Sequence, residues 1–187
     1  RAGNLDNQEI NQVEDRLCAT IGTCMVMGTA STMASLAEAL GIMIPGGATP
    51  PAVMGDRRRQ AEATGRVIVS MIKSDLRPSQ ILTPHAFENA MRVLMAIGGS
   101  TNAVIHLTAI AKRLGITLKL QDFDKISNET PLLVNVKPNG QYYMEDLWKA
   151  GGIPTVMKEL EDCLHCDALT VLGTTIRENL KEVASPP

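Results

Sequence analysis

Apolar residues recur every three or four positions along much of the chain, a pattern that predicts helices. The clearest case is 31–40, where a hydroxyl residue is available as the N-terminal cap and Gly41 ends the helix. Its inward positions are Met33, Leu36, Ala37 and Leu40. Segment 4–16 is mostly polar, with isolated apolar positions such as Ile10 and Val13, so we expect an exposed helix there.

The same spacing predicts helices over 56–74 and 84–96 and a third between the glycine pair 98–99 and Gly115. The first of these is expected to bury Ala61, Val67, Ile68, Met71 and Ile72. The apolar arc of the third comprises Ala103, Val104, Leu107, Ile110, Ala111 and Leu114. His106 lies at the flank of that arc, and we expect it to be a partly buried packing residue.

A few strands are also expected, from short apolar runs beside turn residues. Residues 132–136 and 141–143 flank Asn139-Gly140 and predict a hairpin, and 169–172 predicts a further strand. Shorter helices are expected over 144–150, 154–162 and 176–183, and the proline- and glycine-rich segment 44–51 is expected to form a loop.

The fold class predicted from these elements is α/β, a helix-rich part of a layered domain with a few short strands. We assign 1–183 to that domain and 184–187 to the start of a linker, and we expect the chain to be a piece of a longer protein. A piece of this kind exposes apolar surface, so we also expect a homo-oligomer.

Composition narrows the class of partner. The 187 residues are 44% apolar, enough for one sizeable core, and the formal charge of −2 gives no basic footprint for nucleic acid or an anionic membrane. No apolar run reaches the ~18 residues that span a bilayer, so we expect a soluble cytoplasmic protein. The triplet Arg57-Arg58-Arg59 is interpreted as a solvated helix face.

The best candidate for metal chemistry is Cys24. Glycines at 22 and 28 allow backbone N–H groups to approach its sulfur, and the helix that follows adds positive partial charge at its N-terminus. The alternative is that Cys24 is a small core residue among methionines.

Other residues leave two alternatives open. Cys163-x-x-Cys166 could join Cys18 and Cys24 in a structural zinc site of an interaction module, although the five-residue gap between Cys18 and Cys24 is unusual for zinc. The segment 97–102 could bind an anion at the start of a helix or form a plain tight turn.

Five blocks, taken together and in order, resemble the dihydroxy-acid and sugar-acid dehydratases. They are Gly22-Thr23-Cys24 with Gly28-Thr29-Ala30 and Thr32-Met33; Glu38-Ala39-Leu40-Gly41 with Pro45-Gly46; Gly98 to Ala103 with His106-Leu107; Met144 to Leu147 with Ala150 to Pro154; and Asp167 to Val171. The resemblance covers only a middle portion of the family's enzymes, namely the latter part of the N-terminal α/β domain and the start of the connection to the C-terminal domain.

The resemblance implies a hydro-lyase that converts 2,3-dihydroxy acids to 2-keto acids with an iron–sulfur cluster, of 2Fe-2S or 4Fe-4S type, and Mg²⁺. It implies that Cys24 is one of three cysteine ligands of the cluster, and that the Mg²⁺ ligands and the catalytic residues lie outside this chain. The block Met27 to Met33 favours a small-molecule sugar acid of the pentonate type. A dihydroxy acid of branched-chain amino-acid biosynthesis is the alternative.

Overall fold

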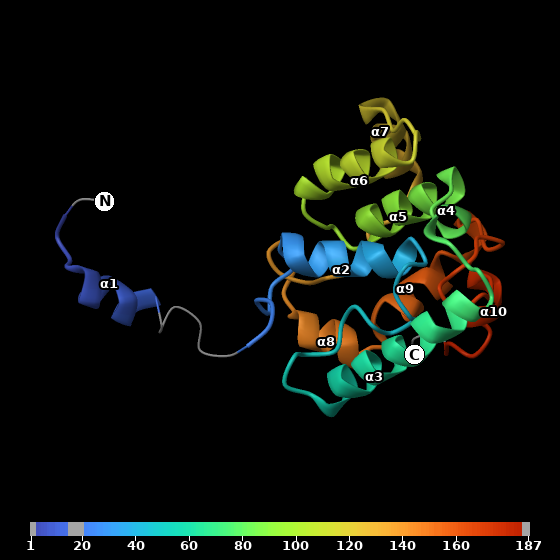
Figure 1. The fold of residues 1–187 in the computed structure, drawn as a ribbon. Coiled ribbons are helices and arrows are strands. Elements are labelled where there is room, and N and C mark those ends of the chain that lie inside the picture. The colour runs from blue at the N-terminus through green and yellow to red at the C-terminus, as the bar shows by residue number, and fades with distance from the viewer. Residues whose placement is uncertain (1–2, 15–20, 185–187) are drawn as a thin grey trace.

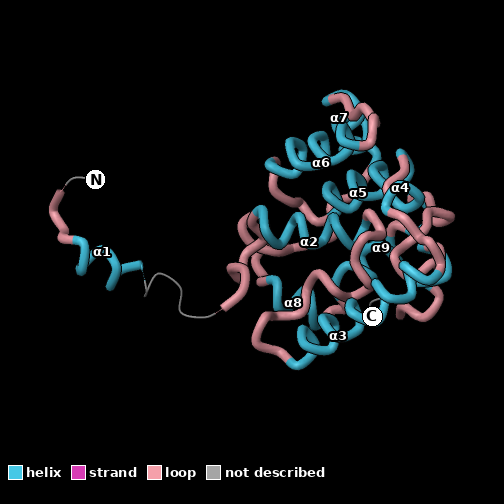
Figure 2. The backbone as a smooth tube through the Cα atoms, in the orientation of Figure 1, coloured by secondary structure: helices cyan, strands magenta, loops and turns pink. Residues whose placement is uncertain are grey.

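The computed structural model describes residues 3–14 and 21–184, and every regular element within them is a helix (Figures 1 and 2). In chain order these are α1 (Asn7–Glu14), α2 (Thr29–Ala39), α3 (Gly55–Lys73), α4 (Pro78–Ile81), α5 (Pro84–Ala96), α6 (Asn102–Arg113), α7 (Leu120–Glu129), α8 (Met144–Lys149), α9 (Gly152–Glu159), the 3-10 helix η1 (Glu161–Cys163) and α10 (Ile176–Leu180). The helix-rich half of the fold prediction is therefore confirmed.

The core is centred on α2 and α5, which pack against each other. Leu36 of α2, Phe87 of α5 and Ile153 of α9 are completely buried. Helices α6 and α7 pack on one side of this pair and α9 on another, with α8 beside α9 (Figure 1). Burial of these apolar side chains is the main contribution that fixes the arrangement of the helices.

The expected strands are not confirmed within the described residues. In their place lie two isolated bridges, Val136 with Tyr142 and Leu169 with Thr175. Asn135 explains why the first bridge does not extend into a hairpin. Its carbonyl oxygen accepts from the N–H of Tyr142 at 3.0 Å, and its Oδ1 accepts from the N–H of Gln141 at 3.0 Å. These bonds close a compact loop too tight for a ladder to extend.

The strongly periodic helices agree with prediction more closely than their caps do. Thr83 caps α5 through its hydroxyl, which accepts from the N–H of Ala86 at 3.3 Å. The expected hydroxyl cap of α2 is wrong, because the N-cap is Gly28 and no side chain caps the helix. His106 is exposed instead of packed, and α4 and α7 were not predicted.

Helix α3 has the predicted length but not the predicted burial. None of its residues is buried, and Ile68 and Ile72 are 50% and 74% exposed. Val67 and Met71 are half-buried. The helix lies along the outside of the body (Figure 1), so its outer apolar residues stay exposed. The proposed linker lies almost wholly outside those residues.

Candidate functional site

Cys24 lies exposed in the segment that leads into α2. Its thiol donates to the carbonyl oxygen of Val26 at 3.5 Å. A Cβ atom placed on Gly28 would lie 3.7 Å from the sulfur, so the sulfur sits beside the N-cap of α2. Because no side chain caps this helix, its positive N-terminal end is available to an anion near the sulfur.

Two backbone hydrogen bonds hold this segment against a distant part of the chain. The N–H of Met27 donates to the carbonyl of Lys137 at 2.7 Å, and the N–H of Met144 donates to the carbonyl of Met25 at 2.8 Å. The side chain of Met27 is buried. The compact loop before α8 therefore anchors the segment that carries Cys24, while leaving the thiol at the surface.

A hollow of ≈ 510 Å³ lies beside Cys24. It is lined by the segment around Cys24, by α2, by the loop 48–53 and by the start of α8. Ser31 lines this hollow too, and its hydroxyl is buried without a hydrogen-bond partner among the described residues. A buried hydroxyl of this kind usually has a partner, so it fits a bound group with an acceptor atom.

Glu38 holds the loop that forms the far wall of the hollow. Its two carboxylate oxygens accept from the N–H groups of Gly46 at 2.6 Å and Ala48 at 2.9 Å. Burial raises the pKa of Glu38 from 4.5 to about 7, and the hydrogen bonds from the loop backbone oppose that rise. The sequence signal for this role is a single glutamate in an otherwise apolar part of α2.

Arg57 holds the same loop from α3. Its guanidinium donates to the carbonyl oxygens of Gly47 at 2.7 Å and Pro50 at 2.6 Å. The interpretation of the arginine triplet as a solvated face is thus correct for Arg58 and Arg59, which are exposed, and wrong for Arg57. Sequence spacing alone did not reveal that this arginine turns back onto a loop.

The segment 97–102 forms a tight turn. The N–H of Ser100 donates to the hydroxyl of Thr32 at 3.0 Å, and the N–H of Asn102 donates to the hydroxyl of Ser100 at 3.3 Å. Asn102 also donates through Nδ2 to the hydroxyl of Thr29 at 2.8 Å. These donors are occupied by the protein itself, so the tight-turn alternative is the one that the structure supports over anion binding.

The structure does not bring Cys24 together with the other described cysteines. Cys163 is exposed, whereas Cys166 is buried and its thiol donates to the carbonyl of Glu161 at 3.4 Å. Burial raises the pKa of the Cys166 thiol, which disfavours the thiolate that zinc requires. Among the described residues the one metal-ligand group contains His85, His165 and Asp167 and no cysteine. Cys18 lies outside the described residues.

None of the described helices combines the length and the apolar character needed to cross a bilayer.

Residues 1–179 match the family model described as dihydroxy-acid/6-phosphogluconate dehydratase N-terminal. The chain therefore belongs to this dehydratase family, as the resemblance of its sequence blocks predicted.

Curated relatives support the same conclusion. The chain is 48% identical over 186 residues to dihydroxy-acid dehydratase of Sulfurisphaera tokodaii. This alignment covers 98% of the chain and 33% of the relative. It is 46% identical over 187 residues to dihydroxy-acid dehydratase of Metallosphaera sedula, and this alignment covers 99% of the chain and 34% of the relative. It is 48% identical over 189 residues to dihydroxy-acid dehydratase of Nocardioides sp., and this alignment covers 99% of the chain and 33% of the relative. The chain spans about a third of the length of these relatives.

Proposed function

We propose that this chain forms part of a hydro-lyase that removes water from a 2,3-dihydroxy acid, and that Cys24 binds its iron–sulfur cluster. The observation that carries the proposal is the exposed thiol of Cys24 beside an uncapped helix N-terminus and a hollow of ≈ 510 Å³. The chain's membership of the dehydratase family supplies the class of reaction.

The residues around Cys24 fit a cluster of this kind. A thiolate is the usual protein ligand of cluster iron, and the glycine at position 28 leaves room close to the sulfur. The hydroxyl of Ser31 lines the same hollow and has no partner among the described residues, so it can donate to a sulfide or a substrate oxygen. When bound, the cluster supplies an iron atom that acts as a Lewis acid on a substrate hydroxyl.

The chain's own contribution is to place these groups. Backbone hydrogen bonds of Met25 and Met27 hold the ligand segment, and Glu38 and Arg57 hold the opposite wall of the hollow. We propose that the other two cluster cysteines, the Mg²⁺ ligands and the catalytic base lie in the remaining two thirds of the enzyme. The chain alone is then inactive.

The substrate is the finer part of the proposal. The relatives are named dihydroxy-acid dehydratase, which favours the alternative of a dihydroxy acid, and the block Met27 to Met33 favours a sugar acid of the pentonate type. Both substrates carry the carboxylate and adjacent hydroxyls that the reaction needs. We further propose a cytoplasmic location and a homo-oligomer, and the exposed apolar residues of α3 support the association.

The test is to assay the intact enzyme for 2-keto acid formation from 2,3-dihydroxyisovalerate and from pentonates, at equal cluster content. Turnover of either substrate supports the hydro-lyase, and their ratio of kcat/KM assigns the substrate class. Failure to release a 2-keto acid from both substrates by a fully loaded enzyme would overturn the proposal.

A further inference from the structure

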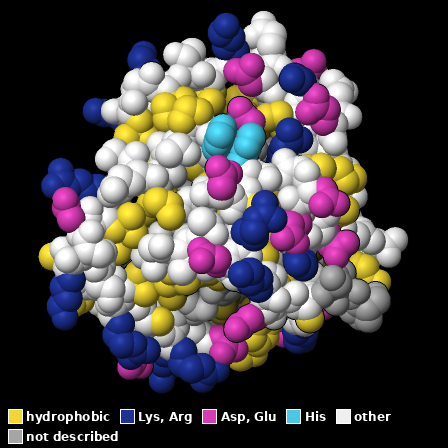
Figure 3. Space-filling view, turned by 90° about the vertical axis from the view of Figure 1, so that its right-hand side faces the viewer, with side chains coloured by type: hydrophobic (Ala, Val, Ile, Leu, Met, Phe, Trp, Pro, Cys, Tyr) yellow, Lys and Arg dark blue, Asp and Glu magenta, His cyan; other side chains and the backbone are white. Residues whose placement is uncertain are grey.

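A second group of metal-ligating side chains lies apart from Cys24 and its hollow. His85 belongs to the first turn of α5, and His165 and Asp167 follow η1. One potential ligand atom from each of these three residues lies within 4.8 Å of the other two. Figure 3 shows the two histidine side chains side by side at the surface, with acidic side chains next to them. We propose that His85, His165 and Asp167 bind a divalent transition-metal ion of the Zn²⁺ class.

The two imidazole rings are already adjacent. Their centroids are 4.0 Å apart and their planes differ by 5°, so the rings are stacked. Ligand bonds of about 2.1 Å at a tetrahedral ion place the ligand atoms about 3.4 Å apart, so the three ligand atoms must approach one another by little more than an ångström. The ring of His85 must also turn out of the stack, so that its nitrogen lone pair points to the same ion as that of His165. His85 and Asp167 are exposed and can rotate to make this adjustment.

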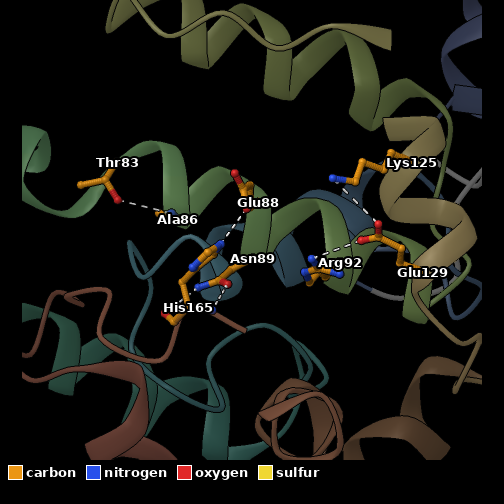
Figure 4. A network of polar contacts seen from close by, with 8 residues as sticks. All are labelled: Thr83, Ala86, Glu88, Asn89, Arg92, Lys125, Glu129 and His165. Atoms are coloured by element: carbon orange, nitrogen blue, oxygen red, sulfur yellow. Dashed lines mark hydrogen bonds and ion pairs between the residues drawn. The ribbon is translucent and has the colours of Figure 1, made fainter. Parts of the chain in front are cut away.

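His165 is held in place before any ion binds. Its backbone N–H donates to Oδ1 of Asn89 at 2.8 Å, and its carbonyl accepts from Nδ2 of the same residue at 3.1 Å. Asn89 is completely buried in α5 (Figure 4). This pair of hydrogen bonds fixes the chain at His165 against α5, so the cost of ordering one ligand is met by the fold.

Glu88 selects which ring nitrogen of His165 is free. Its Oε2 lies 2.6 Å from Nε2 of His165, and an ionised carboxylate can only accept, so Nε2 carries the hydrogen. In the neutral ring the lone pair is then on Nδ1, which is the atom left for a metal. A carboxylate that orients a metal-binding histidine in this way is a common arrangement around zinc.

The donor set also indicates which ions bind. Imidazole nitrogen with carboxylate oxygen suits Zn²⁺, Ni²⁺ and Co²⁺, whereas Mg²⁺ and Ca²⁺ prefer sites made wholly of oxygen. Asp167 and Glu88 supply carboxylate groups next to the two rings. A bound ion would join the start of α5 to the segment after η1, which are separated by about eighty residues of chain.

Nickel titration of the full chain, followed by NMR of the imidazole Cε1–H signals, tests this site directly. The chain has three histidines, and exposed His106 on α6 serves as the internal control. We expect paramagnetic Ni²⁺ to broaden the signals of His85 and His165 well before that of His106, and Mg²⁺ to leave all three unchanged.

Matched variants complete the test. The affinity for Zn²⁺ is measured by its competition with Ni²⁺, as the Zn²⁺ concentration that protects the His165 signal from broadening by Ni²⁺. We expect His85→Gln to weaken Zn²⁺ binding by about tenfold or more, and His106→Gln to leave it unchanged. Asp167→Asn, at an exposed position, provides a second variant that should also weaken binding if His85→Gln fails to fold. Equal broadening of all three histidines, or unchanged Zn²⁺ affinity in the variant that folds, would overturn the proposal.

Discussion

At the scale of single residues, Glu38 of α2 holds the loop that forms one wall of the hollow beside Cys24. It is a buried carboxylate that accepts two backbone N–H bonds from the loop at Gly46 and Ala48. Buried carboxylates without a cation partner are uncommon, because burial disfavours their charged form. Here the loop backbone supplies the compensation, so loop and glutamate depend on each other.

The pH dependence of stability should report this residue. The pKa of Glu38 is raised in the folded chain from 4.5 to about 7, so between these values the unfolded chain loses the proton while the folded chain keeps it. The free energy of unfolding should therefore fall as the pH rises through this window, by at most about 3 kcal/mol. Urea denaturation followed by circular dichroism at a series of pH values measures this slope.

The matched variant for that prediction is Glu38→Gln, which cannot titrate and should lose this part of the slope. Glu62→Gln, at an exposed position of α3, should retain it. If wild type and Glu38→Gln show the same change of unfolding free energy between pH 4.5 and 7, the pKa of Glu38 is not raised and its role here is wrong.

At the scale of elements, the contact between α2 and the turn before α6 depends on Gly99. A Cβ atom at this position would lie 2.8 Å from Cδ1 of Leu94 and 2.8 Å from Cγ2 of Thr32. Both neighbours are buried and have little room to move. The absence of a side chain at Gly99 is therefore what allows the turn to approach α2, and so to place Ser100 against Thr32.

Gly99→Ala should accordingly lower the free energy of unfolding by about 1–3 kcal/mol through overpacking. Gly65→Ala is the control, since its Cβ would have nothing within 4 Å and alanine is the better helix former within α3. In this control variant the free energy of unfolding should rise by about 0.5–1 kcal/mol. Thermal or urea denaturation measures both, and equal effects in the two variants would contradict the packing argument.

The elements also divide into those that the sequence pattern could predict and those that it could not. Helices α2, α5 and α6 were predicted because their apolar residues are periodic and their glycine or proline boundaries are clear. The hairpin over 132–143 failed because Asn135 closes the loop through its own side chain. Helix α7 was missed although Phe123 and Ile126 have helical spacing and are buried.

The candidate site divides in the same way. Cys24 could be named from its glycine neighbours and from family resemblance, both of which are read directly from the sequence. The roles of Arg57 and of the stacked pair His85 and His165 could not be predicted, because these residues meet their partners only in the folded chain. His85 and His165, for example, stack across a long stretch of sequence that carries no pattern linking them.

At the scale of the whole molecule, the exposed apolar residues of α3 are the clearest unpaired surface among the described residues. Ile68, Val69 and Ile72 are 50%, 50% and 74% exposed on a helix without buried residues. Several such residues on one helix usually mark a contact with another chain or domain. The chain spans about a third of its relatives, so both kinds of contact are consistent with the proposed enzyme.

The isolated chain is therefore expected to self-associate through this helix. Ile72→Lys should shift the chain toward the monomer in analytical ultracentrifugation, because a lysine on the contact must lose its hydration. Ser70→Lys adds the same charge at an exposed polar position of α3 and should have a smaller effect. A wild-type chain that sediments as a monomer at all concentrations tested would contradict this expectation.

The most direct test of the central claim is the visible absorbance and iron content of the intact enzyme with Cys24→Ala, compared with Cys163→Ala. Cys163 is also exposed but belongs to no metal-ligand group among the described residues, so it controls for the loss of a surface thiol. We predict that Cys24→Ala loses the cluster absorbance and the activity, while Cys163→Ala keeps both. Wild-type absorbance and iron content in Cys24→Ala would contradict the account.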